Sequence, residues 1–288
     1  MITKMKKSDY LSISKIFSPV FMDNLANNNL GEIFKVLDLI PKHHKQINSN
    51  LEIRKILNLV YKDFSISYRN EHFYKNTLFN KVILKKHNLN NCLTLSEFRV
   101  GNSILDLAVF NGTTTAYEIK SEIDTPKRLL QQVTDYCKVF EFVYLVTYSK
   151  FLTKIQDEIP DNIGILLLEE KGFNEIKAPK SNRELFNHQY FFDILRIDEF
   201  KNIVKKKFNY IPEVPNTQIY KECYKLFKTI PISEIHNMFI EEISKRQLEQ
   251  HQKKLIKKLP NSIKISAISK RYNEKQCLNI IDKLDLIY

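Results

Sequence analysis

The middle of the chain carries three acidic residues and a lysine at short intervals: Glu97, Asp106, Glu118 and Lys120. Glu118 and Lys120 are two residues apart, so on a β-strand both side chains project from the same face. Carboxylate oxygens are the ligands that a hard divalent cation such as Mg²⁺ prefers. Such an ion can polarise a scissile phosphate and activate water, and an adjacent lysine can position that water. These residue types predict metal-dependent phosphodiester hydrolysis, provided that the fold brings them to one face of a sheet.

The first requirement is a hairpin that brings Glu97 and Asp106 together. Gly101-Asn102 is a two-residue turn signal with glycine at its first central position, and strand-like runs flank it on both sides. Closing the chain there places Glu97 directly opposite Asp106. Two carboxylates in that arrangement destabilise a sheet unless a cation lies between them.

A second hairpin, signalled by Asn111-Gly112, decides the face on which Glu118 lies. A two-residue turn would place Glu118 and Asp106 on opposite faces of the sheet. A three-residue loop over 110–112, with its glycine left-handed, pairs Asp106 with Ala116 and brings both acids to one face. The site hypothesis therefore predicts the longer loop or a bulge in one strand.

The elements around these hairpins follow from hydrophobic periodicity. A helix is expected from Pro126 to Glu141, with Asp124 or Thr125 as its N-cap and one apolar stripe that can lie on a sheet. The expected strands are Leu93–Val100, Ser103–Phe110, Thr114–Lys120, Phe142–Thr147 and Ile163–Leu168. The expected helices are Glu71–Lys86, Asp193–Lys206, Gln218–Thr229, Ile232–Leu259 and two short ones after it, with further helices in residues 1–65.

This pattern resembles the motif of the PD-(D/E)XK nuclease superfamily: Glu97, then Asp106, then Glu118-x-Lys120 on the next strand, followed by a helix. The likeness covers roughly residues 70–150 and includes the order helix, three-strand meander, helix, strand. The run from Tyr117 to Asp124, with Arg128, Gln132 and Tyr136 after it, is similar to a branch of uncharacterised bacterial proteins placed in that superfamily. The chain departs from the motif at its proline, which is replaced by Leu105.

The resemblance implies a role for each matching position. Asp106, Glu118 and the backbone carbonyl of Ile119 would bind the metal, which would be Mg²⁺ or Mn²⁺. Lys120 would orient or activate the water, and Glu97 would complete the metal site directly or through water. Glu71, on the preceding helix, is an alternative to Glu97 as the first acidic residue. Gln132 and Tyr136 match positions that assist contacts with substrate or metal-bound water.

Three cations near these positions, Arg99, Lys127 and Arg128, are candidates for phosphate contacts, with ordinary solvated charges as the alternative. The chain as a whole has 45 Lys and Arg against 33 Asp and Glu, a net charge of +12 over 288 residues. That excess favours an anionic partner, most often nucleic acid, although a generally lysine-rich composition would also explain it. The lysine-rich stretch Ser244–Lys258 has the same two interpretations, with a solvated helix favoured.

Other function classes find no support in the sequence. There is no phosphate-binding loop, nucleophile elbow or dinucleotide fingerprint. No apolar run is long enough to span a membrane, and no secretory leader is expected. The four cysteines are widely spaced and contain no CxxC, which is typical of reduced thiols in a cytoplasmic protein.

The sequence therefore predicts an α/β fold: a restriction-endonuclease-like PD-(D/E)XK core with a mixed sheet over residues 69–185, between a helical segment at 1–68 and a helical region at 186–288. The expected function is a metal-dependent nuclease acting on DNA rather than RNA, alone, as a homo-oligomer or with a partner protein. The alternative is a catalytically silent module of the same fold that binds nucleic acid or acts as an adaptor in a larger assembly, with antiviral defence as one setting. A silent module would be indifferent to chelators.

Overall fold

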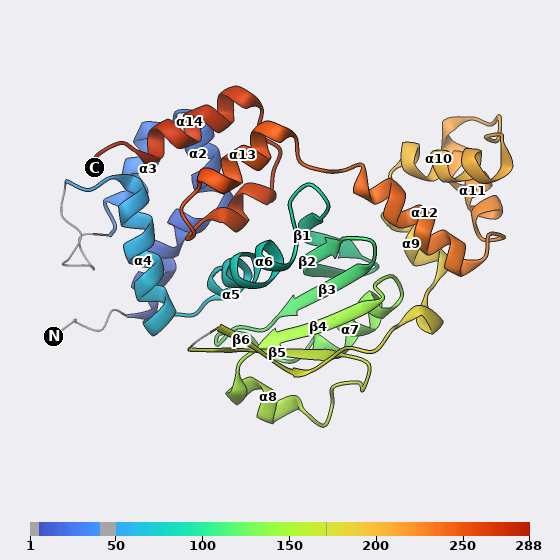
Figure 1. Ribbon diagram of the computed structural model, residues 1–288, viewed down its shortest axis with the longest axis horizontal. Helices are drawn as coiled ribbons and strands as arrows, with labels where there is room; N and C mark the ends of the chain where they lie inside the picture. Colours follow the sequence, from blue (N-terminus) through green and yellow to red (C-terminus); the bar gives the residue numbers. More distant parts are fainter. Residues whose placement is uncertain (1–5, 41–49, 171) are drawn as a thin grey trace. The chain divides into compact units, whose positions relative to one another are not determined.

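The computed structural model describes residues 6–40, 50–170 and 172–288. The chain divides into two compact units, one formed by Met1–Lys86 with Leu248–Tyr288 and the other by His87–Gln247 (Figure 1). This division differs from the three consecutive segments expected from the sequence. The cause lies in the C-terminal segment, whose helix α14 (Glu274–Leu284) packs on α2 (Pro19–Ala26) of the N-terminal segment.

The second unit is built on one six-stranded mixed sheet with the strand order β1 to β6. The first three strands form an antiparallel meander, β3, β4 and β5 run parallel, and β6 returns antiparallel to β5. The α/β class with a mixed sheet is thus confirmed. The strands are β1 Leu93–Val100, β2 Ser103–Phe110, β3 Thr114–Ile119, β4 Phe142–Thr147, β5 Gly164–Glu169 and β6 Gly172–Lys177.

Strand β6 was not expected from the sequence. It contains Asn174, Glu175 and Lys177, and none of its residues is fully buried. A strand with so little apolar burial lacks the alternation by which strands are recognised. Its partner β5 has five buried residues in a row, which is typical of an interior strand.

Among the described residues of this unit, the α-helices are α7 Leu129–Cys137, α8 Ser149–Ile155, α9 His188–Ile194, α10 Ile197–Phe208, α11 Asn216–Phe227 and α12 Ile232–Ser244, with a 3₁₀ turn at Arg183–Leu185. Helix α7 begins three residues later than expected. The Asp124 carboxylate does not cap it but accepts hydrogen bonds from the amide and hydroxyl of Ser121, at 2.8 and 2.5 Å. The predicted apolar stripe of α7 is confirmed, because Leu129, Val133 and Tyr136 are all buried.

Two expected helices are each divided in the structure. Between α9 and α10 the chain turns at Arg196, whose backbone amide donates a hydrogen bond to the Glu199 carboxylate at 2.7 Å. Arg246 lies between α12 and α13 (Gln250–Lys258). Its Nε donates a hydrogen bond to the same Glu199 side chain at 2.6 Å, and its Nη2 donates one to the Ile194 carbonyl at 3.1 Å. The Arg246–Glu199 pair, in which each side chain is 12% exposed, fixes the end of α12 where the chain leaves the unit.

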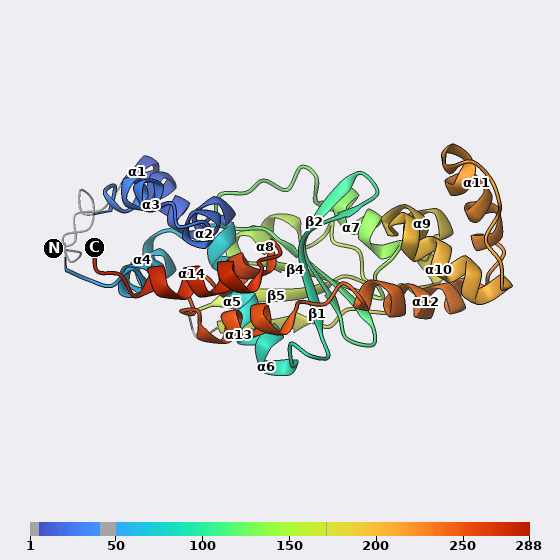
Figure 2. The same ribbon diagram turned by 90° about the horizontal axis from the view of Figure 1, so that it is seen from above.

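The first unit is helical (Figure 2). Its core includes rings of Tyr10, Phe17 and Phe64 in edge-to-face contact. None of the helices in the part of the chain that the structure describes has the length and apolar character needed to cross a membrane. The remaining helical elements are α1 Lys7–Ile13, α3 Leu30–Leu37, α4 Ile53–Ser67, α5 Glu71–Leu78, a π-helical turn Phe79–Ile83, α6 Leu84–Lys86, and the 3₁₀ turns Ser14–Phe17 and Lys264–Ile268.

Candidate functional site

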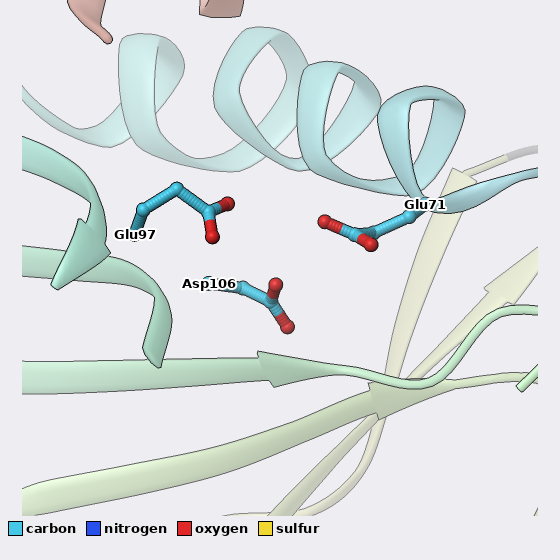
Figure 3. A group of neighbouring side chains, drawn as sticks. All are labelled: Glu71, Glu97 and Asp106. Carbon is cyan, nitrogen blue, oxygen red and sulfur yellow. The ribbon is translucent and has the colours of Figure 1, made fainter. Parts of the chain in front are cut away.

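The first hairpin of the sheet has the predicted register. Val100 pairs with Ser103 across the Gly101-Asn102 turn, and the pairs on either side of Glu97 place it across from Asp106. One carboxylate oxygen of each residue lies within 4.8 Å of the other (Figure 3). The two carboxylates therefore meet on one face of the sheet, as the sequence predicts.

Glu97 has a backbone conformation that the sequence did not indicate. Its φ angle is +53°, in the left-handed region that a residue other than glycine seldom adopts. The strand pairing is correspondingly interrupted at this position, although the register before and after it is unchanged. A locally strained backbone that aims an exposed carboxylate at Asp106 is typical of a functional position.

The tip of this hairpin is held by a buried carboxylate of α7. Asp135 accepts hydrogen bonds from the Ser103 hydroxyl at 2.6 Å and from the Tyr190 hydroxyl at 3.1 Å. The Tyr190 ring lies so close to the turn that a Cβ at Gly101 would come within 2.7 Å of it, and Gly101 has a φ of +57°. Asp135 and Tyr190 thus position the hairpin, and no sequence signal singled them out.

The second hairpin has a three-residue loop, but one residue further along than expected. Phe110 pairs with Thr114, so the loop is Asn111–Thr113, and Gly112 is left-handed with a φ of +94°. The expected pairing of Asp106 with Ala116 is therefore wrong, since this register places Asp106 across from Glu118. The two registers differ by two residues on β3, so the acids still share one face.

Core packing explains the shift. Phe110 is buried, with its ring 5.7 Å from that of Phe98 and 5.8 Å from that of Phe140. Opening the loop at Phe110 would withdraw this ring from the core. The pairing of β2 with β3 ends at Leu107 and Tyr117. Next to this last pair, the Asp106 carboxylate accepts a hydrogen bond from the Ile119 amide at 2.7 Å.

Glu118 and Lys120 form the centre of the site. The side chains project together, as predicted, with Lys120 Nζ 2.7 Å from Glu118 Oε1. Their side chains are only 2% and 11% exposed, so the interaction is far less screened than a surface ion pair. Lys120 Nζ also donates to Gln132 Oε1 at 2.9 Å.

Tyr136 supports the same carboxylate from α7. Its hydroxyl lies 2.9 Å from Glu118 Oε2 and also 2.9 Å from the Ile104 carbonyl. Burial, and next to it the nearby Glu118 charge, raises the pKa of Tyr136 well above its usual range, so the hydroxyl keeps its proton. The ring is fully buried, and the hydroxyl contacts Glu118 and the Ile104 carbonyl, while the role of Tyr136 toward substrate or metal-bound water stays a prediction.

Among the described residues, the three predicted cations take no part in the hydrogen bonds and ion pairs of this group. Arg99 is exposed on β1, two residues from Glu97, and Lys127 and Arg128 are exposed in the segment before α7. Glu71 begins α5 in the first unit (Figure 3). Its carboxylate pairs with Lys75 of the same helix at 2.7 Å. Asp106, Glu118, Lys120 and Tyr136 all belong to the second unit.

The donor set suits a hard cation. Ligand oxygens at about 2.1 Å from Mg²⁺ are at most about 4 Å apart, and those of Ca²⁺ about 5 Å. Oxygens of Glu97 and Asp106 within 4.8 Å of one another thus need to move by less than about 1 Å to share Mg²⁺. Each carboxylate oxygen has two lone pairs, so Glu118 can accept from Tyr136 and still bind a metal.

A protein-family model, described as Bacteriophage P4 protein cII, matches residues 65–276. The chain belongs to this family. Protein cII of Enterobacteria phage P4 is 24% identical to it over 171 residues, which are 57% of this chain. The match spans 63% of the length of that relative.

The family match contains every residue of the candidate site, from Glu97 to Tyr136. Among solved structures, the SPO1766 protein of unknown function from Silicibacter pomeroyi is similar over 41% of this chain and 82% of its own length. That likeness has 11% sequence identity and a TM-score of 0.27, too low to support any statement about fold or function.

Proposed function

We propose that this protein is a metal-dependent nuclease with a PD-(D/E)XK core, hydrolysing phosphodiester bonds in DNA rather than RNA. The observation that carries the proposal is the buried Glu118–Lys120 pair on the same sheet face as Asp106 and Glu97. The order of β1, β2, β3, α7 and β4 supports the superfamily assignment, because it is the order that the resemblance implies.

In this proposal some side chains bind the metal and others position the water. Asp106, Glu118, Glu97 and the Ile119 carbonyl would hold Mg²⁺ or Mn²⁺. When bound, such an ion supplies Lewis-acid polarisation of the phosphate and a more acidic water. Lys120 has three ammonium protons, and Glu118 and Gln132 take two of them. The third can bind the attacking water or a phosphate oxygen as charge develops.

One observation favours the alternative, a silent nucleic-acid-binding or adaptor module of the same fold. The Lys120 ammonium forms an ion pair with Glu118, and a buried ion pair of this kind can also have a purely structural role. The two functions differ in their response to chelators, because only the nuclease needs a metal.

The test is a cleavage assay on supercoiled plasmid, linear duplex, single-stranded DNA and RNA, each with Mg²⁺, Mn²⁺ or EDTA. A nuclease of this class should cut one of the DNA substrates only with metal, and Lys120→Ala should reduce cleavage by two orders of magnitude or more. Metal-independent cleavage, or cleavage of RNA alone, would contradict the proposal. No cleavage by a protein that binds DNA equally well with EDTA would favour the silent module.

A further inference from the structure

The net positive charge of the chain comes from only one of its two units. The helical unit, Met1–Lys86 with Leu248–Tyr288, contains 24 Lys and Arg against 11 Asp and Glu, a net charge of +13. The sheet unit, His87–Gln247, contains 21 against 22, a net charge of −1. The unit that holds Asp106, Glu118 and Lys120 therefore has no charge excess with which to attract a polyanion.

Within the helical unit, six exposed lysines concentrate on two segments. These six lysines form no ion pair with the carboxylates of the described residues, whereas three other lysines of the unit, Lys35, Lys55 and Lys270, are paired. We call this set the lysine face: Lys81, Lys85, Lys86, Lys254, Lys257 and Lys258.

The two segments of the lysine face are joined by hydrogen bonds. The Asn261 carbonyl, just after α13, accepts from the side-chain amides of Asn76 at 2.6 Å and Asn80 at 2.9 Å. Lys81 follows Asn80 directly, and Lys258 precedes Asn261 by three residues. The segment that carries Lys81 is thus joined to the chain just after α13, although the two are far apart in the sequence.

The geometry of α13 turns three of its four lysines outward, and the fourth, Lys253, is buried. Leu255 and Ile256 are buried, while Lys254, Lys257 and Lys258 are exposed at the i, i+3 and i+4 spacing of one helix face. The helix dipole accounts for cations in the last turns of α6 and α13. It does not account for Lys81 or Lys254, nor for an excess of 13 charges over the whole unit.

We propose that the lysine face binds the phosphate backbone of nucleic acid, so that binding and cleavage are carried out by different units of the chain. The inference rests on the proposed function for its ligand. An array of unpaired lysine ammonium groups suits phosphates because each contact releases a condensed counterion, whatever the base sequence. We therefore expect binding without strong sequence preference.

The test measures binding of the full-length protein to a fluorescent 30-base-pair duplex in EDTA, from about 50 to 200 mM salt. The variant Lys85→Gln/Lys86→Gln/Lys257→Gln/Lys258→Gln should flatten the slope of log K against log[salt] by about 3 to 4, if each lysine makes one contact. A matched control, Lys150→Gln/Lys154→Gln/Lys205→Gln/Lys221→Gln, removes four exposed lysines of the sheet unit and should leave the slope unchanged. Circular dichroism verifies that both variants fold.

The outcomes separate this proposal from the nuclease proposal. Equal losses in both variants, or no loss in the lysine-face variant, would overturn the lysine face even if the wild type cuts DNA. A loss confined to the lysine-face variant supports it even if no variant cleaves anything. Lysine-dependent binding to phosphatidylserine vesicles, with no binding to the duplex, would overturn it in favour of an anionic lipid surface.

Discussion

Replacing Lys120 by methionine should destabilise the sheet unit strongly. The substitution keeps most of the side-chain volume but removes the ammonium 2.7 Å from Glu118, whose carboxylate is 2% exposed. Removing one partner of a buried ion pair costs about 3–5 kcal/mol, because the other charge stays in a low-dielectric environment. For a unit of this size that corresponds to a melting temperature lower by roughly 6–20 °C. Lys206→Met, which breaks the exposed pair with Glu241, should cost less than about 1 kcal/mol.

The coupling of the two charges can be measured directly by a double-mutant cycle. Urea denaturation followed by circular dichroism gives the free energies of unfolding of wild type, Lys120→Met, Glu118→Gln and the double variant. Because Glu118→Gln removes the buried charge, the double variant should recover at least about 2 kcal/mol of the loss seen in Lys120→Met. A loss below about 1 kcal/mol in Lys120→Met, or strict additivity of the two single changes, would refute the reasoning that burial makes this pair strong.

Three further predictions concern the turn, His72 of the helical unit and the metal. Gly101→Ala should destabilise the sheet unit by about 1–3 kcal/mol in thermal melts, because its φ is +57° and the new Cβ would lie 2.7 Å from Tyr190; Asn102→Ala, beside it, serves as the control. Burial lowers the pKa of His72 to about 4, so the unfolded state binds more protons between pH 6.5 and 4. The free energy of unfolding of the helical unit should therefore lose none of the His72 contribution above pH 6.5 and should fall by up to about 3 kcal/mol toward pH 4. A His72→Gln variant whose stability depends on pH as steeply as that of the wild type would contradict this. Mn²⁺ at a hundred times its dissociation constant should stabilise the wild type by about 2.7 kcal/mol and Asp106→Asn far less, and equal shifts in both proteins would argue against a metal at this position.

The extent to which the sequence predicts the site varies from residue to residue. The Gly101-Asn102 turn and the period of two along β-strands are local signals, and they place Glu97 across from Asp106 and Lys120 beside Glu118. The second loop depends on where Phe110 packs, which is a tertiary property, so its position was predicted one residue too early. The face of Glu118 was still correct, because the alternation along a strand is unaffected by a shift of two.

Features that depend on distant parts of the chain could not be predicted. Asp135 and Tyr190 hold the hairpin through contacts across 32 and 55 residues, and no local pattern announces them. The left-handed backbone of Glu97 runs against the conformational preference of its residue type. The pairing of the two chain ends in one unit follows from packing of α14 on α2, which hydrophobic periodicity alone does not reveal.

The most direct test of the proposed active site compares Asp106→Asn with Asp157→Asn in the cleavage and binding of plasmid DNA with Mg²⁺. Both changes remove one carboxylate charge from the sheet unit, but Asp157 is exposed and lies outside the site. We expect Asp106→Asn to bind DNA like the wild type and to lose cleavage by at least about a hundredfold, whereas Asp157→Asn should keep both. Cleavage by Asp106→Asn at the rate of the wild type would contradict the central claim that this sheet face is a nuclease active site.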